Sequence, residues 1–280
     1  MWSRRKAGLY VQDALADFYP DVKALPSPIA QRKIYRNRLM ATHLVGFGGG
    51  TSAVSTLKSY SFDGTGDFLD VNDSTNWFFN AARFTADFWI RMNSIALDFQ
   101  WMGQGTDSSN LWFLRWDAVD GAEVQHTDES VYSKWNQGAT TGWSADVWYH
   151  VALIRGWGGN VDDWAITRDG VAVATTTSAA AIGNLTSALK VGAHPTGGGA
   201  TANARMDEIR ISKGTAEWTA DFSGSLPTEE YANSTYELTI HCNETIVSGT
   251  TGSGATFVDS GSTGHTVTEV GNAIRDTSIY

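Results

Sequence analysis

Closely spaced acidic residues are the first candidates for chemistry in this chain. They form three groups: Asp117 with Asp120 and Glu123, Asp128 with Glu129, and Asp162 with Asp163. Hydrolysis of a glycosidic bond needs two carboxyl groups about 5 to 10 Å apart, one of them protonated. Acidic residues at alternate strand positions, as in Glu-x-Asp-x-x-Glu, would supply that spacing, and the sequence has no such pattern. We interpret the three groups as solvated loops and predict that the protein is not an enzyme.

Metal ligands are the second kind of candidate. The histidines have neither His-x-His nor His-Glu-x-x-His spacing, so we do not expect a zinc site. Calcium binds six to eight oxygens from carboxylates and carbonyls. Asp63 and Asp67 in one turn, together with Asp207 in another, could hold a structural calcium ion if the two turns meet. The alternative is that these aspartates only cap their turns.

Tryptophan is the third candidate, because ten of the twelve lie between positions 77 and 164. Indole rings stack on the apolar faces of sugars, and they also fill cores. Those within apolar strand patterns are predicted to lie in the core: Trp89, Trp112 and Trp148. Trp135, Trp143 and Trp157 lie in Gly/Ser/Asn-rich segments, where a large aromatic side chain often contacts a ligand. These three are the candidate carbohydrate- or partner-binding residues, unless they fold back onto the core.

Short alternating runs separated by Gly, Asn, Asp and Ser begin at about Leu57 and predict an all-β sandwich that positions these residues. Residues 111–114 and 151–154 are apolar at both parities, which is typical of central strands covered on both sides, or of one face carrying a binding groove. Asp169-Gly170 predicts a hairpin turn, because glycine tolerates positive φ. His150 lies inside a strand pattern and is interpreted as a hydrogen-bonded core residue.

Residues 1–50 have a different character. Three prolines interrupt them, residues 29–39 could form a basic amphipathic helix, and four glycines in 46–50 predict a hinge. We therefore divide the chain into a partly helical docking arm with a Gly-rich hinge, residues 1–50, and a sandwich, residues 51–280. The predicted docking residues are basic: Arg4, Arg5, Lys6, Arg32, Lys33, Arg36 and Arg38.

Charge also divides the chain. Residues 1–50 hold eight Lys/Arg against three Asp, while residues 51–280 hold twelve Lys/Arg against twenty-seven Asp/Glu. Nucleic-acid binding needs clustered cations, so the acidic body argues against it. We expect no membrane span and no signal peptide, because the apolar runs are too short. Cys242 is alone, which excludes an intrachain disulfide.

Five motifs together resemble the laminin-G-like (concanavalin A-like lectin/glucanase) jelly roll. In order they are Phe62-Asp63-Gly64-Thr65-Gly66-Asp67-Phe68-Leu69, Phe84-Thr85-Ala86-Asp87-Phe88-Trp89-Ile90-Arg91, Trp148-Tyr149-His150-Val151-Ala152-Leu153-Ile154-Arg155, Arg168-Asp169-Gly170 and Met206-Asp207-Glu208-Ile209-Arg210-Ile211-Ser212. The resemblance spans roughly residues 57–275 and departs from the family at Arg168, where relatives have an apolar residue. Its motifs specify strands and turns rather than chemistry. Because relatives of this type are widespread as sugar-binding or adhesive modules, the resemblance implies such a module.

The segment 236–280, which contains Gly264-His265-Thr266-Val267-Thr268, resembles the leader that precedes this sandwich in phage-associated members of the family. The resemblance implies a protein of the tailed-phage virion surface, either a capsid decoration or head fibre or a tail appendage. Its arm would bind other virion proteins, its sandwich would be displayed toward glycans, and it would assemble as a trimer. Segment 236–280 would complete the sandwich or pair with a neighbouring subunit. The alternatives are a free carbohydrate-binding adhesin and, less expected, a glycoside hydrolase.

Overall fold

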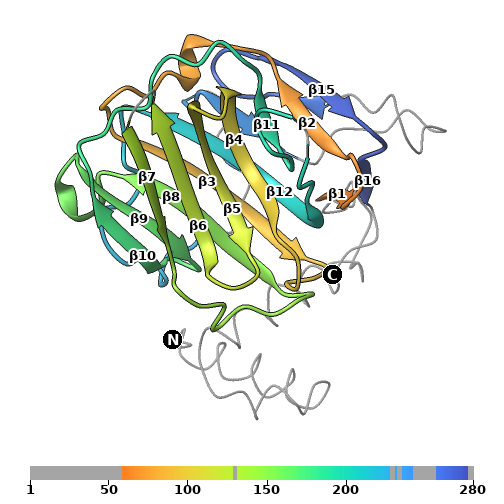
Figure 1. Ribbon diagram of the computed structural model, residues 1–280, viewed down its shortest axis with the longest axis horizontal. Helices are drawn as coiled ribbons and strands as arrows, with labels where there is room; N and C mark the ends of the chain where they lie inside the picture. Colours follow the sequence, from red (N-terminus) through yellow and green to blue (C-terminus); the bar gives the residue numbers. More distant parts are fainter. Residues whose placement is uncertain are drawn as a thin grey trace, which may run out of the picture. The chain divides into compact units, whose positions relative to one another are not determined.

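Two antiparallel β-sheets pack face to face in this protein, and Figure 1 looks onto sheet B with sheet A behind it. The computed structural model describes residues 59–128, 131–197, 199–227, 231, 235–241 and 257–276. For this part of the chain the predicted all-β jelly-roll sandwich is confirmed. The predicted docking arm and hinge, residues 1–50 with the seven predicted docking residues, lie outside the described residues.

Sheet A contains eight strands among the described residues, and each pairs antiparallel with its neighbours. Its order is β10 (Val171–Thr177), β9 (Asp163–Arg168), β8 (Trp148–Arg155), β3 (Phe84–Met92), β12 (Asn203–Lys213), β1 (Ser59–Asp63) and β16 (Ile274–Asp276), with β13 (Leu238–Ile240) also paired to β12. Strand β3 therefore lies near the middle of the sheet, between β8 and β12.

Sheet B also contains eight described strands. Its order is β14 (Phe257–Val258), β15 (Thr266–Val270), β2 (Phe68–Val71), β11 (Leu189–Val191), β4 (Phe99–Asp107), β5 (Asn110–Asp117), β6 (Gly121–Asp128) and β7 (Val131–Asn136). In the described part of the chain, two single-turn 3₁₀ helices lie in connections, η2 (Thr75–Trp77) and η3 (Trp157–Gly159). Among the described residues, no helix has the length and apolar character needed to cross a membrane.

The inner faces of the two sheets meet in one apolar core. Phe84 and Phe88 reach it from β3, and Trp112 and Trp116 reach it from β5 in the facing sheet. Side chains alternate between the two faces of a strand, so the residues between these point outward. This alternation is what places polar side chains on the outer face of each sheet.

The tryptophans predicted to lie in the core divide into three cases. Trp112 is buried between the sheets, as predicted. Trp89 is also buried, but on the outer face of sheet A, where its ring packs against His150 at 5.3 Å. Trp148 is only half-buried, so for this residue the prediction was wrong.

The predicted hairpin turn joins β9 to β10. Asp169 and Gly170 have φ angles of 51° and 80°, the left-handed pair that a two-residue hairpin turn requires. Arg168, the departure from the family pattern, turns its guanidinium over the ring of Trp143 at 5.2 Å and donates a hydrogen bond to the carbonyl of Thr141 at 3.0 Å. The charge is accommodated because it lies over an aromatic ring rather than in the core.

The described C-terminal strands pair within their own chain. Strand β13 extends sheet A beside β12, and β16 pairs with β1. Strands β14 and β15 form the edge of sheet B next to β2. Both sheets therefore contain strands from the two ends of the described chain.

Candidate functional site

Four neighbouring strands, β4 to β7, place a row of polar residues across the outer face of sheet B. Gln100 pairs with Arg115, Arg115 with Glu123, and Glu123 with Asn136. The residues on either side of Arg115, Leu114 and Trp116, belong to the core. Because side chains alternate, the four polar residues of the row point away from the core.

Ion pairs connect the members of this row. Arg115 contacts Glu123 through Nε at 2.7 Å, Asp117 through Nη2 at 2.7 Å and Asp98 through Nη1 at 3.7 Å. Lys134 Nζ lies 2.8 Å from the other oxygen of Glu123. We call this row together with its ion-pair and hydrogen-bond partners the open polar cluster: Asp98, Gln100, Arg115, Asp117, Asp120, Glu123, Lys134 and Asn136. Its charged ends remain accessible, since the side chains of Asp98 and Lys134 are 50% and 34% exposed.

The loop that contains His194 and Ala200 bounds the open polar cluster on one side. It folds back onto sheet B, where the carbonyl of Ala200 accepts a hydrogen bond from the backbone N–H of Gln100 at 2.9 Å, and the ring of His194 packs on Phe113 at 5.3 Å. Oε1 of Gln100 is buried and has no hydrogen-bond partner among the described residues. The row therefore begins beneath this loop and becomes accessible toward β7.

Two apolar side chains project from the loop before β4 and from the loop after β5. Leu97 is 71% exposed and Val119 is 78% exposed. Their loops are joined by a hydrogen bond of 2.8 Å from the backbone N–H of Ala118 to Asp98. Both apolar side chains are thus immediate chain neighbours of residues bonded within the open polar cluster.

Asp117, Asp120 and Glu123 were predicted to be solvated loop residues, and for Asp117 and Glu123 that was wrong. Asp117 is the last residue of β5 and is 9% exposed. Glu123 lies in β6 with its side chain fully buried beneath Arg115 and Lys134. Carboxylate oxygens of Asp117, Asp120 and Glu123 lie within 4.8 Å of one another, close enough to hold a cation. Nitrogens of Arg115 and Lys134 already neutralise two of these carboxylates, so the group is a salt-bridge network in this structure.

The electrostatics of the cluster do not match a glycosidase acid. Burial raises the pKa of Asp117, but hydrogen bonds from the backbone N–H groups of Asp120 and Val119 and the charge of Arg115 outweigh it and lower the pKa. Burial lowers the pKa of Arg115, but its bonds and attraction to Glu123, with the other carboxylates, outweigh it and raise the pKa. A catalytic acid needs the opposite environment, one that raises its carboxyl pKa.

The three tryptophans predicted to contact a ligand do not lie together on this face. Trp143 is 5% exposed within the core, and its Nε1 donates to Gln137 at 2.7 Å, so the folded-back alternative describes it. Trp135 lies in strand β7 rather than a loop and packs inward on Trp164 at 5.3 Å. Trp157 lies in η3 and packs, half-buried, against a small apolar cluster over sheet A.

The three aspartates predicted to hold calcium do not meet. Asp63 pairs with Asn203, and Asp207 lies four residues farther along β12, which separates the two positions by roughly 13 Å along the strand. Asp63 and Asp67 cap their own turn, since Asp63 accepts from the N–H of Thr65 at 2.7 Å and Asp67 accepts from the N–H of Asp63 at 3.2 Å. The turn expected at Asp207 is a β-bulge inside β12. The predicted site was wrong because its members belong to different ends of the paired strands.

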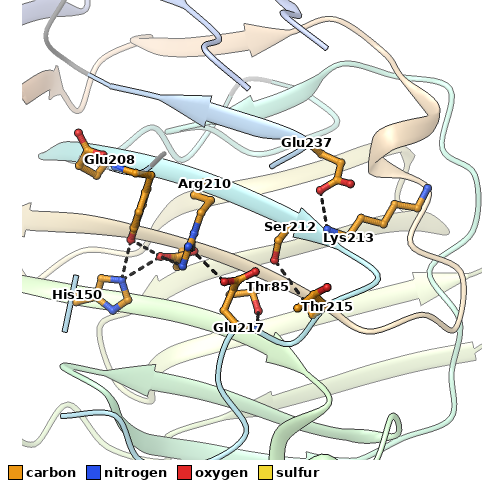
Figure 2. Close-up of polar contacts among 11 residues, drawn as sticks. Thr85, His150, Glu208, Arg210, Ser212, Lys213, Thr215, Glu217 and Glu237 are labelled. Carbon is orange, nitrogen blue, oxygen red and sulfur yellow. Dashed lines mark hydrogen bonds and ion pairs between the residues drawn. The ribbon is translucent and has the colours of Figure 1, made fainter. Parts of the chain in front are cut away.

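A second group of charged residues lies on the outer face of sheet A (Figure 2). Asp87 of β3 accepts hydrogen bonds from Arg210 Nε at 2.8 Å and from the Tyr231 hydroxyl at 2.5 Å, and lies 3.0 Å from His150 Nε2. Arg210 also lies 3.5 Å from Glu217. We call Asp87, His150, Arg210, Glu217 and Tyr231 the covered polar cluster. The prediction that His150 is a hydrogen-bonded buried residue is confirmed.

Residues 214–227 cover this second group, and we call them the covering segment. Trp218 and Phe222 stack at 3.9 Å, and both rings meet His150 edge-on. The guanidinium of Arg210 lies over the rings of Trp218 and Tyr231, at 5.1 and 4.0 Å. Since Asp87 and His150 are fully buried, the centre of this cluster is part of the packing of the described residues.

The pKa shifts in the covered polar cluster follow from burial and close pairing. Burial raises the pKa of Asp87, but the charge of Arg210 and the bonds to His150 and Arg210 outweigh it, so the pKa is lowered. Burial and the neighbouring Asp87 charge raise the pKa of Tyr231 well above its ordinary value. The pKa of Arg210 is raised as well, because Asp87 outweighs the effect of burial. The three groups therefore hold each other in their usual protonation states.

Sequence reasoning missed most of the open polar cluster. Gln100, Arg115 and Asn136 stand in three different strands, and only lateral pairing brings them together. One signal was present: Arg115 interrupts the apolar run of β5 at the outward parity. The prediction that such a strand either is covered on both sides or carries a groove left this possibility open.

Comparison with known proteins gives a family match and a fold. The family model described as the concanavalin A-like lectin/glucanases superfamily matches residues 63–219. No curated protein matches the sequence. A proposed carbohydrate-binding protein from Bacteroides ovatus ATCC 8483 has a TM-score of 0.50 and 16% identity, over 77% of this chain and 59% of its own. The chain thus spans about three fifths of that protein, and the similarity shows the sandwich fold.

Two further solved structures have TM-scores below 0.5. The CBM40 of Ruminococcus gnavus IT-sialidase bound to α2,3 sialyllactose gives 0.44 at 12% identity, over 62% of this chain and all of its own. Domains LG4-5 of the mouse laminin α1 chain give 0.43 at 13% identity, over 55% of this chain and 40% of theirs.

Proposed function

Because the chain belongs to the concanavalin A-like lectin/glucanases superfamily, we propose that it binds an oligosaccharide on the outer face of sheet B and does not cleave it. The observation that carries the proposal is the open polar cluster, a row of charged and amide side chains held in register across four strands. The proposed role of the Bacteroides ovatus relative agrees with it.

The chemistry of this face suits a polyhydroxyl ligand. Sugar hydroxyls both donate and accept hydrogen bonds, so a binding surface needs acceptors and donors side by side. Asp98 and Asp120 supply carboxylate acceptors, and Lys134 and Asn136 supply donors, all on side chains fixed by ion pairs or hydrogen bonds within the cluster. Fixing these groups in advance reduces the entropy lost when a ligand binds.

A non-enzymatic role is supported by the state of the carboxyl groups. Both oxygens of Glu123 are bound by cations, and the pKa of Asp117 is lowered. Neither carboxyl is suited to donate a proton to a leaving group.

We further propose that the sandwich is displayed on the surface of a tailed-phage particle, where residues 1–50 bind other virion proteins and the subunits form trimers. This setting is supported by the division of charge and by the resemblance of residues 236–280 to a phage-associated leader. Antibody raised against residues 51–280 and applied to intact particles tests it. Label over the head would indicate a capsid decoration and label at the tail an appendage, while absence of label would favour a free adhesin.

The glycan proposal is tested by applying the full chain to an oligosaccharide array and titrating the ligands that bind by calorimetry. We expect Lys134→Ala and Gln125→Ala each to weaken binding about tenfold, the effect of losing one hydrogen bond to a charged or amide group. Both side chains lie on the outer face of sheet B, where Gln125 pairs with Lys134.

The matched control is Lys213→Ala. Lys213 belongs to β12 of sheet A and donates a hydrogen bond to the carbonyl of Thr75 at 2.8 Å, so its loss should leave glycan affinity unchanged. All three variants should unfold near the wild-type temperature. Wild-type affinity in both sheet B variants, or an equal loss in Lys213→Ala, would show that the glycan does not bind at this face.

A further inference from the structure

We infer that the oligosaccharide bound at the open polar cluster is uncharged, and that this site rejects acidic sugars such as uronic and sialic acids. The inference rests on the proposed function and specifies its ligand class. Three features of the cluster support it: both of its cations are already paired with protein carboxylates, its net charge is negative, and apolar side chains lie at its edge.

Arg115 is not free to bind a ligand carboxylate. Its Nε and Nη2 are each 2.7 Å from a carboxylate oxygen, of Glu123 and Asp117, and Nη1 lies near Asp98. A guanidinium recognises a carboxylate by presenting two parallel N–H donors. Here its donors already face protein carboxylates on three sides, so an acidic sugar would have to displace one of them.

Lys134 is also committed. Its Nζ lies 2.8 Å from Glu123, whose side chain is fully buried and also contacts Arg115 and Asn136. Drawing Lys134 away toward a ligand carboxylate would break this ion pair, and Oε2 of Glu123 would keep only the 3.4 Å hydrogen bond from Asn136, so exchanging one carboxylate for another gains little. A sugar hydroxyl can accept a hydrogen bond from Lys134 without removing the lysine from Glu123, because an ammonium group has three donors.

The charge that remains in the cluster is negative. It contains the carboxylates Asp98, Asp117, Asp120 and Glu123 against the cations Arg115 and Lys134, a formal excess of two negative charges. His194 does not offset this, because burial and the charge of Arg115 lower its pKa and favour the neutral ring. The body of the protein is acidic as well, so an anionic polymer is repelled at longer range.

The exposed apolar side chains complete the argument. Leu97 and Val119 project beside Asp98, where they can contact the C–H face of a pyranose ring while the hydroxyls at its edge reach the polar cluster. Neither contact requires a charged substituent. The surface as a whole therefore fits a neutral sugar, with an apolar face and a hydroxyl edge.

The test uses matched oligosaccharides that differ by one carboxylate, such as lactose with sialyllactose and neutral with uronic-acid trimers, on an array probed with the full chain. Every pair that binds is then titrated at 50 and 500 mM NaCl. We expect the neutral member to bind at least tenfold more tightly at low salt, and the preference to shrink at high salt, because salt screens repulsion between exposed charges. Asp98→Asn should raise the acidic-to-neutral affinity ratio, since Asn keeps the acceptor for the Ala118 N–H and loses the charge.

The possible failures are distinct. Tighter or equal binding of the acidic member would overturn the inference while leaving the proposed function intact. A neutral preference that does not respond to salt or to Asp98→Asn would also overturn it, because discrimination would then have a cause other than charge. Absence of binding to every member of every pair would overturn the proposed function itself.

Discussion

Each sheet of the sandwich carries an arginine paired with a carboxylate on its outer face, and the two pairs have different surroundings. On sheet A, Arg210 of β12 pairs with Asp87 of β3, and the covering segment 214–227 buries both. On sheet B, Arg115 of β5 pairs with Glu123 of β6, and Arg115 remains partly exposed. The two pairs have the same strand geometry, since each joins register partners of adjacent antiparallel strands.

The difference shows what a polar pair needs in order to be buried or left open. The covered pair has its bonds completed by Tyr231 and His150 and its cation enclosed by aromatic rings. Buried charges require such completion because an unpaired one is costly. The open pair, Arg115 with Glu123, is instead flanked by Asp98 and Asp120, whose carboxylate oxygens are accessible. Charge on sheet A therefore serves the fold, while charge on sheet B is available to a ligand.

The largest expected effect on stability comes from removing the central carboxylate of the covered polar cluster. Asp87→Asn removes the closest counter-charge of the buried Arg210 and leaves only Glu217 at 3.5 Å, so we expect the free energy of unfolding to fall by about 3 kcal/mol or more. Denaturant unfolding followed by tryptophan fluorescence measures it. Hydrogen exchange should also become faster in the covering segment 214–227, because Tyr231 and Arg210 lose a shared partner.

The control for Asp87→Asn lies on the same strand. Arg91 of β3 pairs with Asp146 at 2.6 Å, and the side chain of Asp146 is 62% exposed. Asp146→Asn should cost less than about 1 kcal/mol, as exposed ion pairs do. Equal effects of the two substitutions would mean that burial of the Asp87 pair contributes nothing particular to stability.

A smaller effect is expected for the hydroxyl that completes the covered pair. Tyr231→Phe removes the bond to Asp87 and should cost about 1–3 kcal/mol at neutral pH. Because burial and Asp87 raise the pKa of Tyr231 in the folded state, the stability it adds is present below the unfolded pKa of 10.0 and is lost as the pH rises toward the folded value.

The measurement is a series of urea unfolding curves for wild type and Tyr231→Phe between pH 7 and 11. The difference in unfolding free energy should narrow above pH 10, since only the wild type has this phenol to ionise. A constant difference across the series would count against a buried phenol coupled to Asp87. Glycan affinity should be unchanged in the variant, because Tyr231 belongs to sheet A's covered polar cluster.

The fold could be predicted from sequence because its signals are local. The short alternating runs that begin at about Leu57, such as residues 84–92, and the Asp169-Gly170 turn each depend on a few neighbouring residues, and both are present in the structure. The calcium prediction failed because the distance between residues on two different strands depends on how the strands are paired, and local sequence patterns do not show that register. Asp63 and Asp207 belong to strands β1 and β12, and the pairing sets them four residues apart along the sheet.

The candidate site could not be predicted in the same way, because it consists of side chains that are isolated in sequence. Arg115 and Glu123 become neighbours only through the pairing of β5 with β6. The polar sequence around Trp143 was equally misleading. This tryptophan is in a polar loop and is nevertheless buried in the core, where Gln137 accepts the hydrogen bond from its Nε1. Polarity of the surrounding sequence does not show which way a loop aromatic turns.

The smallest expected effect on stability comes from the open polar cluster of sheet B. Lys134→Ala removes a partly exposed cation from Glu123, whose carboxylate keeps Arg115, so we expect a cost below about 1 kcal/mol. In a double-mutant cycle with Glu123→Gln, the coupling energy should likewise stay below about 1 kcal/mol and decrease at high salt.

The matching cycle between Tyr231→Phe and Asp87→Asn should give a larger coupling that salt does not change, because both groups are buried. If the two cycles gave similar coupling energies that salt does not change, the open polar cluster would serve to stabilise the fold, as the covered polar cluster does, and would not be a preorganised binding surface. A weak coupling together with the tenfold loss of glycan affinity in Lys134→Ala would instead separate the two roles. The lysine would then contribute little to folding and much to recognition, as its partly exposed position above a buried carboxylate implies.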